Sequence, residues 1–416
     1  MAQLSNDCFS HSGSLMTLEQ ALSIVTERTP VVAGCEVVSL DNALGRVVYE
    51  ETFAKNNLPP FPNSAVDGYA VCYDDLLPGT ETELPSSGRI AAGSIQRLKT
   101  AGRAVRIFTG APMPCDADTV FMQEDVEVTD GKVRLPPGLS RGANMRPAGE
   151  DIERGLRILS AGQRLRPQDI ALAAATGHTH IKVRRRLRVA ILSTGNELAN
   201  LGARLVSGSV YDSNRVMLAT LLARAGAEIR DFGIVQDDRN AVADRFASAS
   251  TGNDLIISSG GVSLGEEDHV KDAVRSSGQL VFWRIAIKPG RPLAMGVING
   301  VPFVGLPGNP AAVYVTFLFF VLPLLAHLGG AQAPRTLALR VRSTFPAKKK
   351  KGRREYIRVS VTRAADGILE ARKFPKEGAA LLTSLTESDG LAEIGDDIEA
   401  IAVGDMITYY PHDAFW

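Results

Sequence analysis

The strongest constraint on the fold of this chain is the alternation of apolar runs with helix-like segments between residues 185 and 330. LRVAILSTGNEL is a nearly continuous apolar strand followed by a loop with glycine, and helix-like and strand-like segments alternate after it as far as GLPGNP. Buried strands that alternate with helices are typical of a parallel sheet covered on both faces. We therefore expect a multidomain α/β protein that binds its ligand at the carboxyl ends of this central sheet.

The length leaves room for more than this central α/β domain. At about 150 residues per domain, 416 residues correspond to about three domains. Residues 17–180 predict an elongated N-terminal region with a small β-rich insert at about 55–140, where short β-like runs alternate with Gly, Pro and Thr. Residues 336–412 predict a small C-terminal β domain, and residues 1–16 a flexible polar tail.

The charge balance and the cysteines narrow the class of protein. The chain has 46 basic and 46 acidic residues, which argues against nucleic acid as a partner, because nucleic-acid-binding domains are usually clearly basic. None of its four cysteines forms a CxxC pair, and the first residues lack a basic flank followed by an apolar core. These features predict a cytoplasmic protein without a disulfide framework.

The stretch AAVYVTFLFFVLPLLAHL, from Ala311 to Leu328, is about long enough to span a bilayer. It starts directly after the PGNP turn, and Pro310 suits the first turn of a helix. A helix that is apolar on all sides lies either in a core or in a membrane. We favour a buried core or dimer-interface helix and expect no membrane span.

The segment SSGGVSLGEEDH follows an apolar strand and opens a helix. Small residues let backbone N–H groups approach a ligand, and the start of a helix favours negative charge. A Mg²⁺ ion between the acids and a phosphate would explain why carboxylates stand beside such a loop. The alternative, an acid-rich first turn that only stabilises the helix, stays open. The candidate residues of this segment are Ser259, Gly260, Gly261, Ser263, Gly265, Glu267 and Asp268.

Two further loops carry anion-binding features. In GLPGNPAA the residues Pro307, Gly308, Asn309 and Pro310 join a strand to a helix, and N–H groups before that helix could hold an anion. In IKPGRP, cationic side chains follow an apolar strand, where they suit a phosphate or an oxyanion. A plain tight connection and solvated loop charges are the respective alternatives. The cations are Lys288 and Arg291.

Acids also collect near the ends of the predicted strands. Glu197 follows the first strand, and Asp237 and Asp238 follow the second. Single acids in loops are mostly turn formers, but several at one edge are compatible with metal or nucleotide binding. Asp67 in PPFPNSAVDGYAV and Thr109 in TGAPMP stand among prolines and apolar residues, where turn chemistry in a small β domain is the alternative.

Several common motifs are missing from the chain. There is no Walker A pattern, no GxGxxG after the first central strand and no HExxH. Their absence argues against a P-loop NTPase, a nicotinamide dehydrogenase and a zincin-type metalloprotease.

Taken together, the motifs resemble the molybdopterin molybdenumtransferase family of the MoeA type, which is also similar to the E domain of gephyrin. PPFPNSAVDGYAV, IFTGAPMP, MRPAGEDI, LSTGNEL, ISSGGVSLGEED, AIKPGRP and GLPGNPAA match in order and at family-like spacing. The resemblance runs from about Leu15 to Tyr410. Enzymes of the MogA type share only residues 185–330, so the regions on both sides favour the MoeA type.

The resemblance implies a transferase of molybdenum cofactor biosynthesis. Such an enzyme takes adenylylated molybdopterin and molybdate, cleaves the phosphoanhydride with Mg²⁺, releases AMP and inserts molybdenum into the dithiolene. It also implies a homodimer whose active site joins the central domain of one subunit to the N-terminal region of the other. A MogA-type adenylyltransferase is the partner expected to supply the substrate.

The resemblance also assigns roles to single residues. Asp67, Thr109, Lys288 and Asp268 correspond to catalytic positions, and Glu197, Asp237, Asp238 and Glu267 to acids associated with nucleotide or Mg²⁺ binding. The remaining candidates are expected to bind substrate: Asp151, Ser259, Gly260, Gly261, Ser263, Gly265, Arg284, Arg291, Pro307, Gly308, Asn309, Pro310, Arg353 and Arg358.

Two departures from the family pattern affect these assignments. Arg284 stands where some members have lysine, which keeps the charge but not the geometry. Ala379 stands where the family often has serine, so a hydroxyl contact is lost. A MogA-like adenylyltransferase and a gephyrin-like scaffold remain alternatives. The sequence does not separate molybdate from tungstate, name the enzyme that accepts the cofactor, or show which acids bind Mg²⁺.

Overall fold

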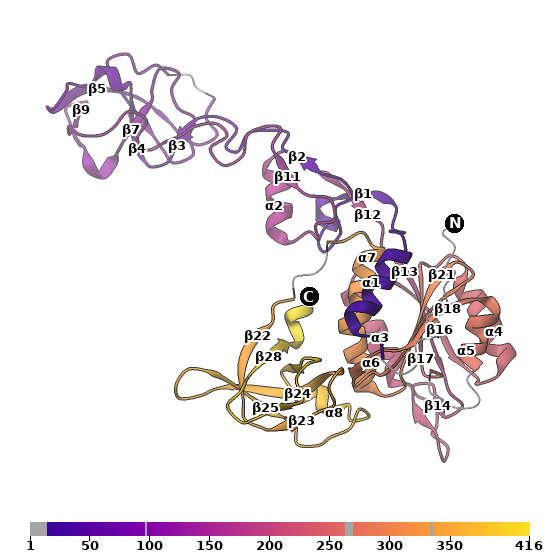
Figure 1. Ribbon diagram of the computed structural model, residues 1–416. Helices are drawn as coiled ribbons and strands as arrows, with labels where there is room; N and C mark the ends of the chain where they lie inside the picture. Colours follow the sequence, from indigo (N-terminus) through magenta and orange to yellow (C-terminus); the bar gives the residue numbers. More distant parts are fainter. Residues whose placement is uncertain (1–14, 96–97, 263–268, 333–335) are drawn as a thin grey trace.

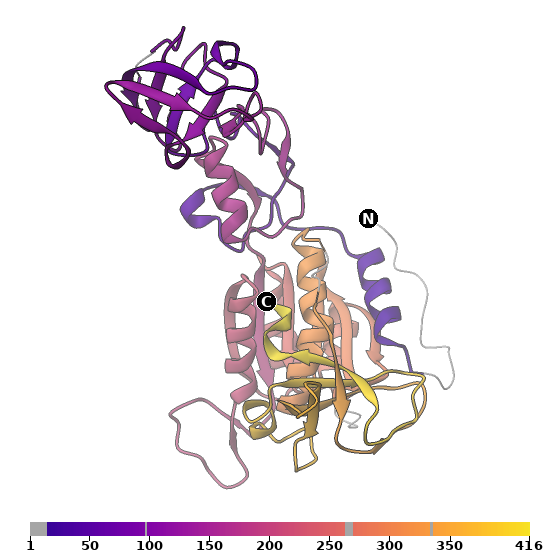
Figure 2. The same cartoon turned by 90° about the vertical axis from the view of Figure 1, so that its left-hand side faces the viewer.

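The computed structural model describes residues 15–95, 98–262, 269–332 and 336–416. The described chain is elongated (Figure 1): the β-rich insert of the N-terminal region lies at one end, and the central sheet and the C-terminal β domain lie together at the other. Figure 2 shows the same separation after a quarter turn. The predicted site residues of the insert therefore lie far from those of the central sheet within one chain.

The central sheet has six strands, and most of it is parallel. Strands β16, β13, β17 and β21 pair in parallel, whereas β20 runs antiparallel to both of its neighbours. The expected parallel sheet is therefore mixed at one edge. In spatial order the strands are β16 (Glu228–Val235), β13 (Arg188–Thr194), β17 (Leu255–Ser259), β21 (Val301–Leu306), β20 (Pro292–Ile298) and β18 (Gly278–Arg284).

Helices cover both faces of this sheet, as expected for buried strands. Because side chains alternate along a strand, Val189 and Ile191 pack on one face, and Ala190 and Leu192 on the other. The first face is covered by α1 (Leu18–Arg28), α3 (Ser213–Arg224) and the long apolar helix, and the second by α4 (Arg239–Ser250) and α5 (His269–Ser277). The multidomain α/β fold class is confirmed.

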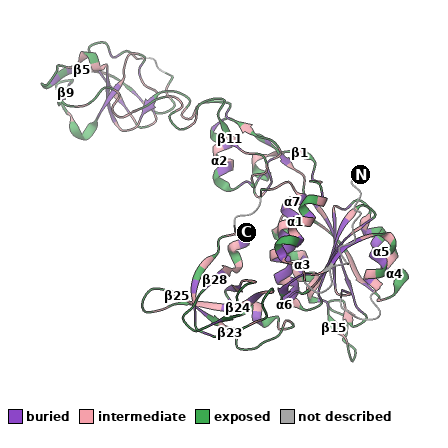
Figure 3. Ribbon diagram, viewed as in Figure 1, coloured by how far each residue is buried: buried purple, intermediate pink, exposed green. Residues whose placement is uncertain are grey.

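The apolar helix runs from Pro310 to Leu328 as α6 (Pro310–Thr316), a π-helical turn (η5, Phe317–Val321) and α7 (Leu322–Leu328). By length and composition it could cross a membrane, but 78% of its apolar window is buried inside the protein. Figure 3 shows this helix as a largely buried element between the central sheet and the C-terminal domain. Such burial is what the interpretation as a core helix requires.

The N-terminal region connects the insert to the central domain. Its elements pack around one small apolar cluster that includes Val48, Leu165 and Val183. The paired strands and the helix that form it are β1 (Cys35–Ser39) with β12 (His180–Arg184), β2 (Thr52–Phe53) with β11 (Arg157–Leu159), and α2 (Pro167–Ala175).

The insert is a six-stranded sheet with apolar clusters on its two faces. Its strands in spatial order are β7 (Thr119–Met122), β4 (Gly68–Val71), β6 (Ala104–Ile107), β5 (Thr82–Ile90), β9 (Lys132–Leu135) and β8 (Glu127–Thr129). A short pair, β3 (Asn63–Ser64) and β10 (Met145–Arg146), lies where the two connecting segments enter it.

The C-terminal domain is built on the third six-stranded sheet of the described chain, and one strand of this sheet comes from the central domain. The two-residue strand β19 (Ile287–Lys288) pairs with the first residues of β24, which ties the IKPGRP loop to the C-terminal domain. The other strands are β24 (Arg354–Arg363), β25 (Leu369–Lys373), β22 (Leu339–Ser343), β28 (Met406–Pro411) and β26 (Gly390–Ile394).

The remaining described elements are short. They are the strand pairs β14 (Leu198–Ala199) with β15 (Val210–Tyr211) and β23 (Ala347–Lys348) with β27 (Ala400–Ile401), the helix α8 (Thr383–Thr386), and the 3₁₀ turns η2 (Leu40–Asn42), η3 (Tyr73–Asp75), η4 (Gln123–Asp125) and η6 (His412–Phe415).

Candidate active site

Three parallel strands of the central sheet end side by side, and the loops that follow them form one surface. Ser193 of β13 lies in register with Ser259 of β17, which lies in register with Leu306 of β21. The N–H of Gly260 donates to the carbonyl of Leu306 at 3.1 Å. Because β18 runs in the same direction as β21, its last residue, Arg284, ends at this edge too. The topology therefore gathers the SSGG, PGNP and IKPGRP loops.

The two glycines after β17 are required by close packing. Both have positive φ, +87° at Gly260 and +66° at Gly261. A Cβ on Gly260 would lie 2.4 Å from the carbonyl oxygen of Thr194, and one on Gly261 would lie 2.4 Å from the Thr194 hydroxyl oxygen. Only glycine allows the loop to follow this path. The loop backbone is therefore held against the end of β13.

Asn214, in the first turn of α3, connects two of the predicted loops. Its Nδ2 donates to Ser259 Oγ at 3.0 Å and to the carbonyl of Gly308 at 2.7 Å. The preceding Asp212 caps α3 by accepting the N–H of Arg215. Sequence reasoning missed Asn214, although it is the second residue of a helix that packs on this sheet. The amide fixes the spacing between the SSGG and PGNP loops.

Buried polar atoms without a hydrogen-bond partner lie at this edge. Among the described residues, they include Thr194 Oγ1, Asn214 Oδ1 and Asp237 Oδ1. Leaving a buried polar atom unpaired costs about 1–3 kcal/mol, and most such groups in proteins have a partner. Such atoms beside glycine-rich loops are expected where a polar ligand binds.

The acids predicted at this edge have different surroundings. The exposed side chain of Glu197 lies against the backbone of its own loop. A Cβ built on Gly195 would be 2.6 Å from Glu197 Oε2. The N–H of Asp237 donates to Asn196 Oδ1 at 3.1 Å, and its own Oδ1 is unpaired. Asp238 Oδ1 accepts two backbone N–H groups and caps α4.

Asp238 therefore has a structural role as a helix cap, and this role uses one of its two carboxylate oxygens. Within the described ranges no three His, Cys, Asp or Glu side chains are grouped as a metal site would require. Four further candidates, Ser263, Gly265, Glu267 and Asp268, lie outside the described residues.

The predicted cation Lys288 lies on β19 and extends toward the C-terminal domain. Its Nζ is 3.1 Å from Glu355 Oε2, and its side chain remains 57% exposed, so the ammonium group stays accessible to a ligand. The carboxylate of Glu355 is buried and also pairs with Arg353. Sequence reasoning missed Glu355, because in the sequence it is a single acid next to a run of basic residues. Arg284 and the exposed Arg291 flank Lys288 at the two ends of this loop.

The C-terminal domain contacts the PGNP loop through its backbone. Arg358 donates to the carbonyl of Gly378 at 2.8 Å and to Ser384 Oγ at 3.1 Å, and burial lowers the pKa of its guanidinium. The next carbonyl, that of Ala379, accepts the N–H of Ala311 at 3.0 Å. Arg358 therefore supports the loop that carries Ala379. The N–H of Ala311, in the first turn of α6, is therefore not open for an anion.

Asp67 and Thr109 form a pair at the end of the insert. Asp67 Oδ1 accepts the Thr109 N–H at 2.8 Å and its hydroxyl at 2.7 Å. The backbone hydrogen bond and then the side-chain hydrogen bond lower the pKa of Asp67. Asp151 is exposed in the segment that returns from the insert, and its N–H donates to the carbonyl of Leu58. The structure brings Asp67 and Thr109 together but keeps them away from the central loops within one chain.

Comparison with known proteins identifies this arrangement. The family model of the MoeA N-terminal region (domain I and II) matches residues 16–177, that of a probable molybdopterin binding domain matches 190–327, and that of the MoeA C-terminal region (domain IV) matches 340–412. A molybdopterin molybdenumtransferase from Haemophilus influenzae is 35% identical over 403 residues, which are 95% of this chain and 98% of that protein. The chain belongs to the MoeA family.

Two further MoeA-type proteins extend the comparison. A molybdopterin molybdenumtransferase from Nostoc sp. is 37% identical over 368 residues, which cover 86% of this chain and 84% of that protein. The crystal structure of a molybdopterin biosynthesis MoeA protein from Pyrococcus horikoshii superposes with a TM-score of 0.84 at 27% identity, covering 96% of this chain and all of that one. The MoeA likeness thus includes the insert with Asp67 and the central loops alike.

Proposed function

We propose that this chain catalyses the metal-insertion step of molybdenum cofactor biosynthesis: it takes adenylylated molybdopterin and molybdate, releases AMP and inserts molybdenum into the dithiolene. The observation that supports it most is the carboxyl edge of the central sheet. Glycine-rich backbone, unpaired buried polar atoms and the cations Arg284, Lys288 and Arg291 meet there. The relatives named molybdopterin molybdenumtransferase support the same reaction.

The chemistry of this edge suits a substrate that is anionic at both ends. Guanidinium and ammonium groups bind phosphate and oxyanions through charge-assisted hydrogen bonds. Glu355 holds Lys288 by one carboxylate oxygen, while most of the lysine side chain stays exposed. We assign Lys288 the task of holding the phosphate or the molybdate while the phosphoanhydride is attacked, because it is a charge whose position is fixed before substrate arrives.

Two of the described carboxylates are suitable ligands for Mg²⁺. Asp237 offers a carboxylate oxygen without a hydrogen-bond partner, and Mg²⁺ is commonly held by one or two carboxylates together with substrate phosphates. Glu197, on the neighbouring loop, is the second candidate. When bound, Mg²⁺ would neutralise charge on the phosphoanhydride.

The Asp67–Thr109 pair is assigned to the active site of a partner subunit. Within one chain the insert lies too far from the central loops to reach a shared substrate, so a homodimer with a composite site accounts for both groups. A carboxylate with a lowered pKa is a weak base. We therefore assign Asp67 the role of a fixed negative charge and hydrogen-bond acceptor, oriented by Thr109.

The proposal also includes a cellular compartment and a partner protein. The chain works in the cytoplasm, and it receives its substrate from a MogA-type adenylyltransferase. A pull-down of the two purified proteins, with and without adenylylated molybdopterin, measures that contact.

The decisive experiment measures AMP. Purified protein is mixed with adenylylated molybdopterin, Mg²⁺ and molybdate, and AMP is quantified by chromatography alongside activation of a molybdenum-free reporter enzyme. We expect AMP release and reporter activation to depend on molybdate together. Consumption of ATP with free molybdopterin, without any need for molybdate, would instead identify an adenylyltransferase of the MogA type. If the protein neither releases AMP nor consumes ATP, the result would favour a scaffold role.

A further inference from the structure

A second ligand site is suggested by a pocket of about 530 Å³ at the opposite edge of the central sheet. It is lined by residues 44–47 of the N-terminal region, 184–187 before β13, 223–227 between α3 and β16, and 414–416 at the end of the C-terminal domain. Residues that precede β13 and β16 lie at the amino edge of these strands. The pocket is therefore separate from the loops of the candidate active site.

Arginines dominate the polar part of this pocket. Six arginines and no Asp or Glu are found among its described lining residues. Acids from outside the pocket neutralise three of them: Glu36 pairs with Arg46, Asp254 with Arg185 and Asp413 with Arg224. The remaining three, Arg164, Arg184 and Arg186, have no carboxylate partner in the described part of the chain.

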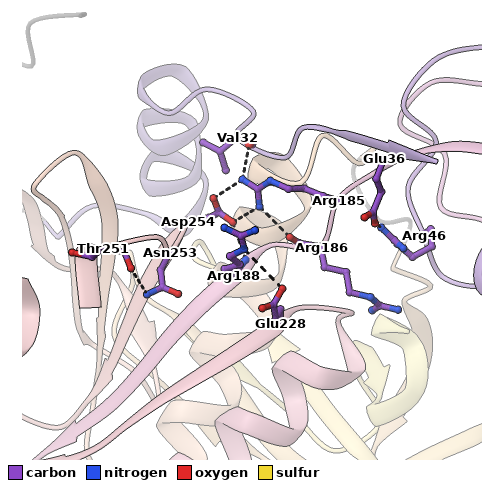
Figure 4. Close-up of polar contacts among 10 residues, drawn as sticks. All are labelled: Val32, Glu36, Arg46, Arg185, Arg186, Arg188, Glu228, Thr251, Asn253 and Asp254. Atoms are coloured by element: carbon purple, nitrogen blue, oxygen red, sulfur yellow. Dashed lines mark hydrogen bonds and ion pairs between the residues drawn. The ribbon is translucent and has the colours of Figure 1, made fainter. Parts of the chain in front are cut away.

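Figure 4 shows how the contacts of Arg185 and Arg186, two consecutive residues between β12 and β13, differ. Arg185 reaches Asp254 with two bonds of 2.6 and 2.7 Å and also donates to the carbonyl of Val32. The side chain of Arg186 points away from this pair, on the side of Arg46. Both arginines line the pocket, but only Arg185 is paired with a carboxylate.

Arg164 and Arg186 converge on Gly226. Arg186 Nη1 donates to the carbonyl of Gly226 at 3.0 Å, and Arg164 Nη1 donates to that of Gly45 at 2.8 Å. A Cβ built on Gly226 would lie 3.5 Å from Arg186 Nη1 and 3.8 Å from Arg164 Nη1. Protein atoms around Arg164, and then the nearby charge of Arg186, lower the pKa of Arg164. Two like charges therefore meet, and neither has a carboxylate partner within the described ranges.

Capping of α3 explains only part of this arrangement. Cationic side chains often bond the last carbonyls of a helix, and Gly226 follows the end of α3. A guanidinium has five N–H donors, however, and both arginines use Nη1 alone for these carbonyls. Their other donors are available to an anion in the pocket, which would also relieve the repulsion between them.

The rest of the pocket is apolar. Leu322 and Leu325 of α7 and the rings of Phe415 and Trp416 form its other wall, and the guanidinium of Arg224 lies 4.6 Å from the centre of the Trp416 ring. A volume of about 530 Å³ is typical of small-molecule sites. We propose that this pocket binds a small phosphate ester whose phosphate pairs with Arg164 and Arg186 and whose apolar or aromatic body packs on Trp416.

Calorimetric titration tests this proposal on the full chain with phenyl phosphate, inorganic phosphate and phenol as probes. We expect phenyl phosphate to bind more tightly than inorganic phosphate, and phenol not to bind. The double variant R164Q/R186Q should weaken phenyl phosphate at least about tenfold, the effect of losing one good charged contact. The matched control R103Q/R372Q removes two exposed arginines elsewhere and should bind like wild type. Equal binding by all three proteins would overturn the proposal.

Two further measurements locate the probe. Trp416 is one of only two tryptophans, so phenyl phosphate should change the fluorescence, and W416F should remove the change. Lys288→Gln, at the candidate active site, should leave this binding intact. Loss of binding in Lys288→Gln but not in R164Q/R186Q would place the probe in the active site and reject the pocket. If R164Q/R186Q unfolds, the charge-conserving R164K/R186K serves as the second variant and should still lose affinity, because lysine lacks the bidentate geometry.

Discussion

The central loops and the Asp67–Thr109 pair supply the two parts of the proposed active site, but they are held in place by different means. At the central edge, buried strand ends, two glycines with positive φ and the Asn214 amide fix the backbone. In the insert, one carboxylate is fixed by two hydrogen bonds from an exposed threonine. Changes at the first are expected to affect folding and activity together, whereas changes at the second should affect activity alone.

The largest effect is expected for Gly260→Ala. The new methyl group would lie 2.4 Å from the Thr194 carbonyl at a φ of +87°, so we expect the free energy of unfolding to fall by about 3 kcal/mol and AMP release to be lost. Gly233→Ala is the matched control, since Gly233 has a φ of +74° but no atom within 4 Å of its Cβ; it should cost about 1 kcal/mol. Urea unfolding measures both, and equal losses would mean that the close approach is not the cause.

Asp67→Asn should leave the fold intact and lower kcat about 100-fold, which corresponds to about 2.7 kcal/mol of transition-state stabilisation. The amide keeps the shape of the carboxylate but removes its charge. Circular dichroism melts check the fold, and AMP release checks the rate. A fall in melting temperature as large as that of Gly260→Ala would remove the distinction between the two regions.

Mixing variants tests whether the two regions meet between subunits. Asp67→Asn and Lys288→Gln should each keep about one hundredth of wild-type activity or less. Refolding them together should restore about a quarter of wild-type activity, since half of the dimers are mixed and each of these has one intact site. Refolding each variant by itself is the control. No recovery in the mixture would place both residues in sites formed within one chain.

Asn214→Ala should have a smaller effect on both properties. It removes the bonds to Ser259 and Gly308, so we expect a loss of about 1–2 kcal/mol in stability and a fall in kcat/KM of about tenfold. Asn42→Ala, which removes one exposed bond to Ser39, is the control and should change neither. A rate effect without a stability effect would show that Asn214 contacts substrate rather than positions the loops.

The smallest expected effect is on the pH dependence of stability. It involves His412, which lies where the central and C-terminal domains meet. The ring of His412 contacts Tyr314 and Ser388, and burial lowers its pKa. Because the folded protein disfavours the charged ring, stability should be complete above pH 6.5 and fall as the pH drops through the folded pKa. We expect His412→Gln to flatten this dependence, which melting temperatures measured between pH 7 and 5 would show. The exposed His180→Gln should keep the wild-type profile.

Motifs and hydrophobic periodicity predicted much of the fold and part of the site. The strands of the central sheet, the covering helices and the loops after β13, β17 and β21 follow from local patterns. The buried character of the helix from Pro310 to Leu328 was expected as well. The antiparallel direction of β20 was not, because a short apolar run has the same pattern in either direction.

Contacts between residues far apart in the sequence could not be predicted. The pairing of Lys288 with Glu355, the two bonds of Asn214 and the acceptance of the Ala311 N–H by Ala379 each join separate elements. Ala379 shows the consequence clearly. The sequence drew attention to its missing hydroxyl, but the described contact uses its backbone carbonyl, which any residue provides.

The sequence by itself determined which segments become strands, helices and loops, because side-chain periodicity and glycine or proline positions act locally. It also carried the ordered motifs of the MoeA family. Only the tertiary structure decided that the insert, whose sequence includes Asp67, lies far from the central sheet in one chain, and that Arg164 and Arg186 meet over Gly226. The direction in which the insert extends and the neighbours of each charge depend on packing between distant segments, and such packing leaves no local pattern in the sequence.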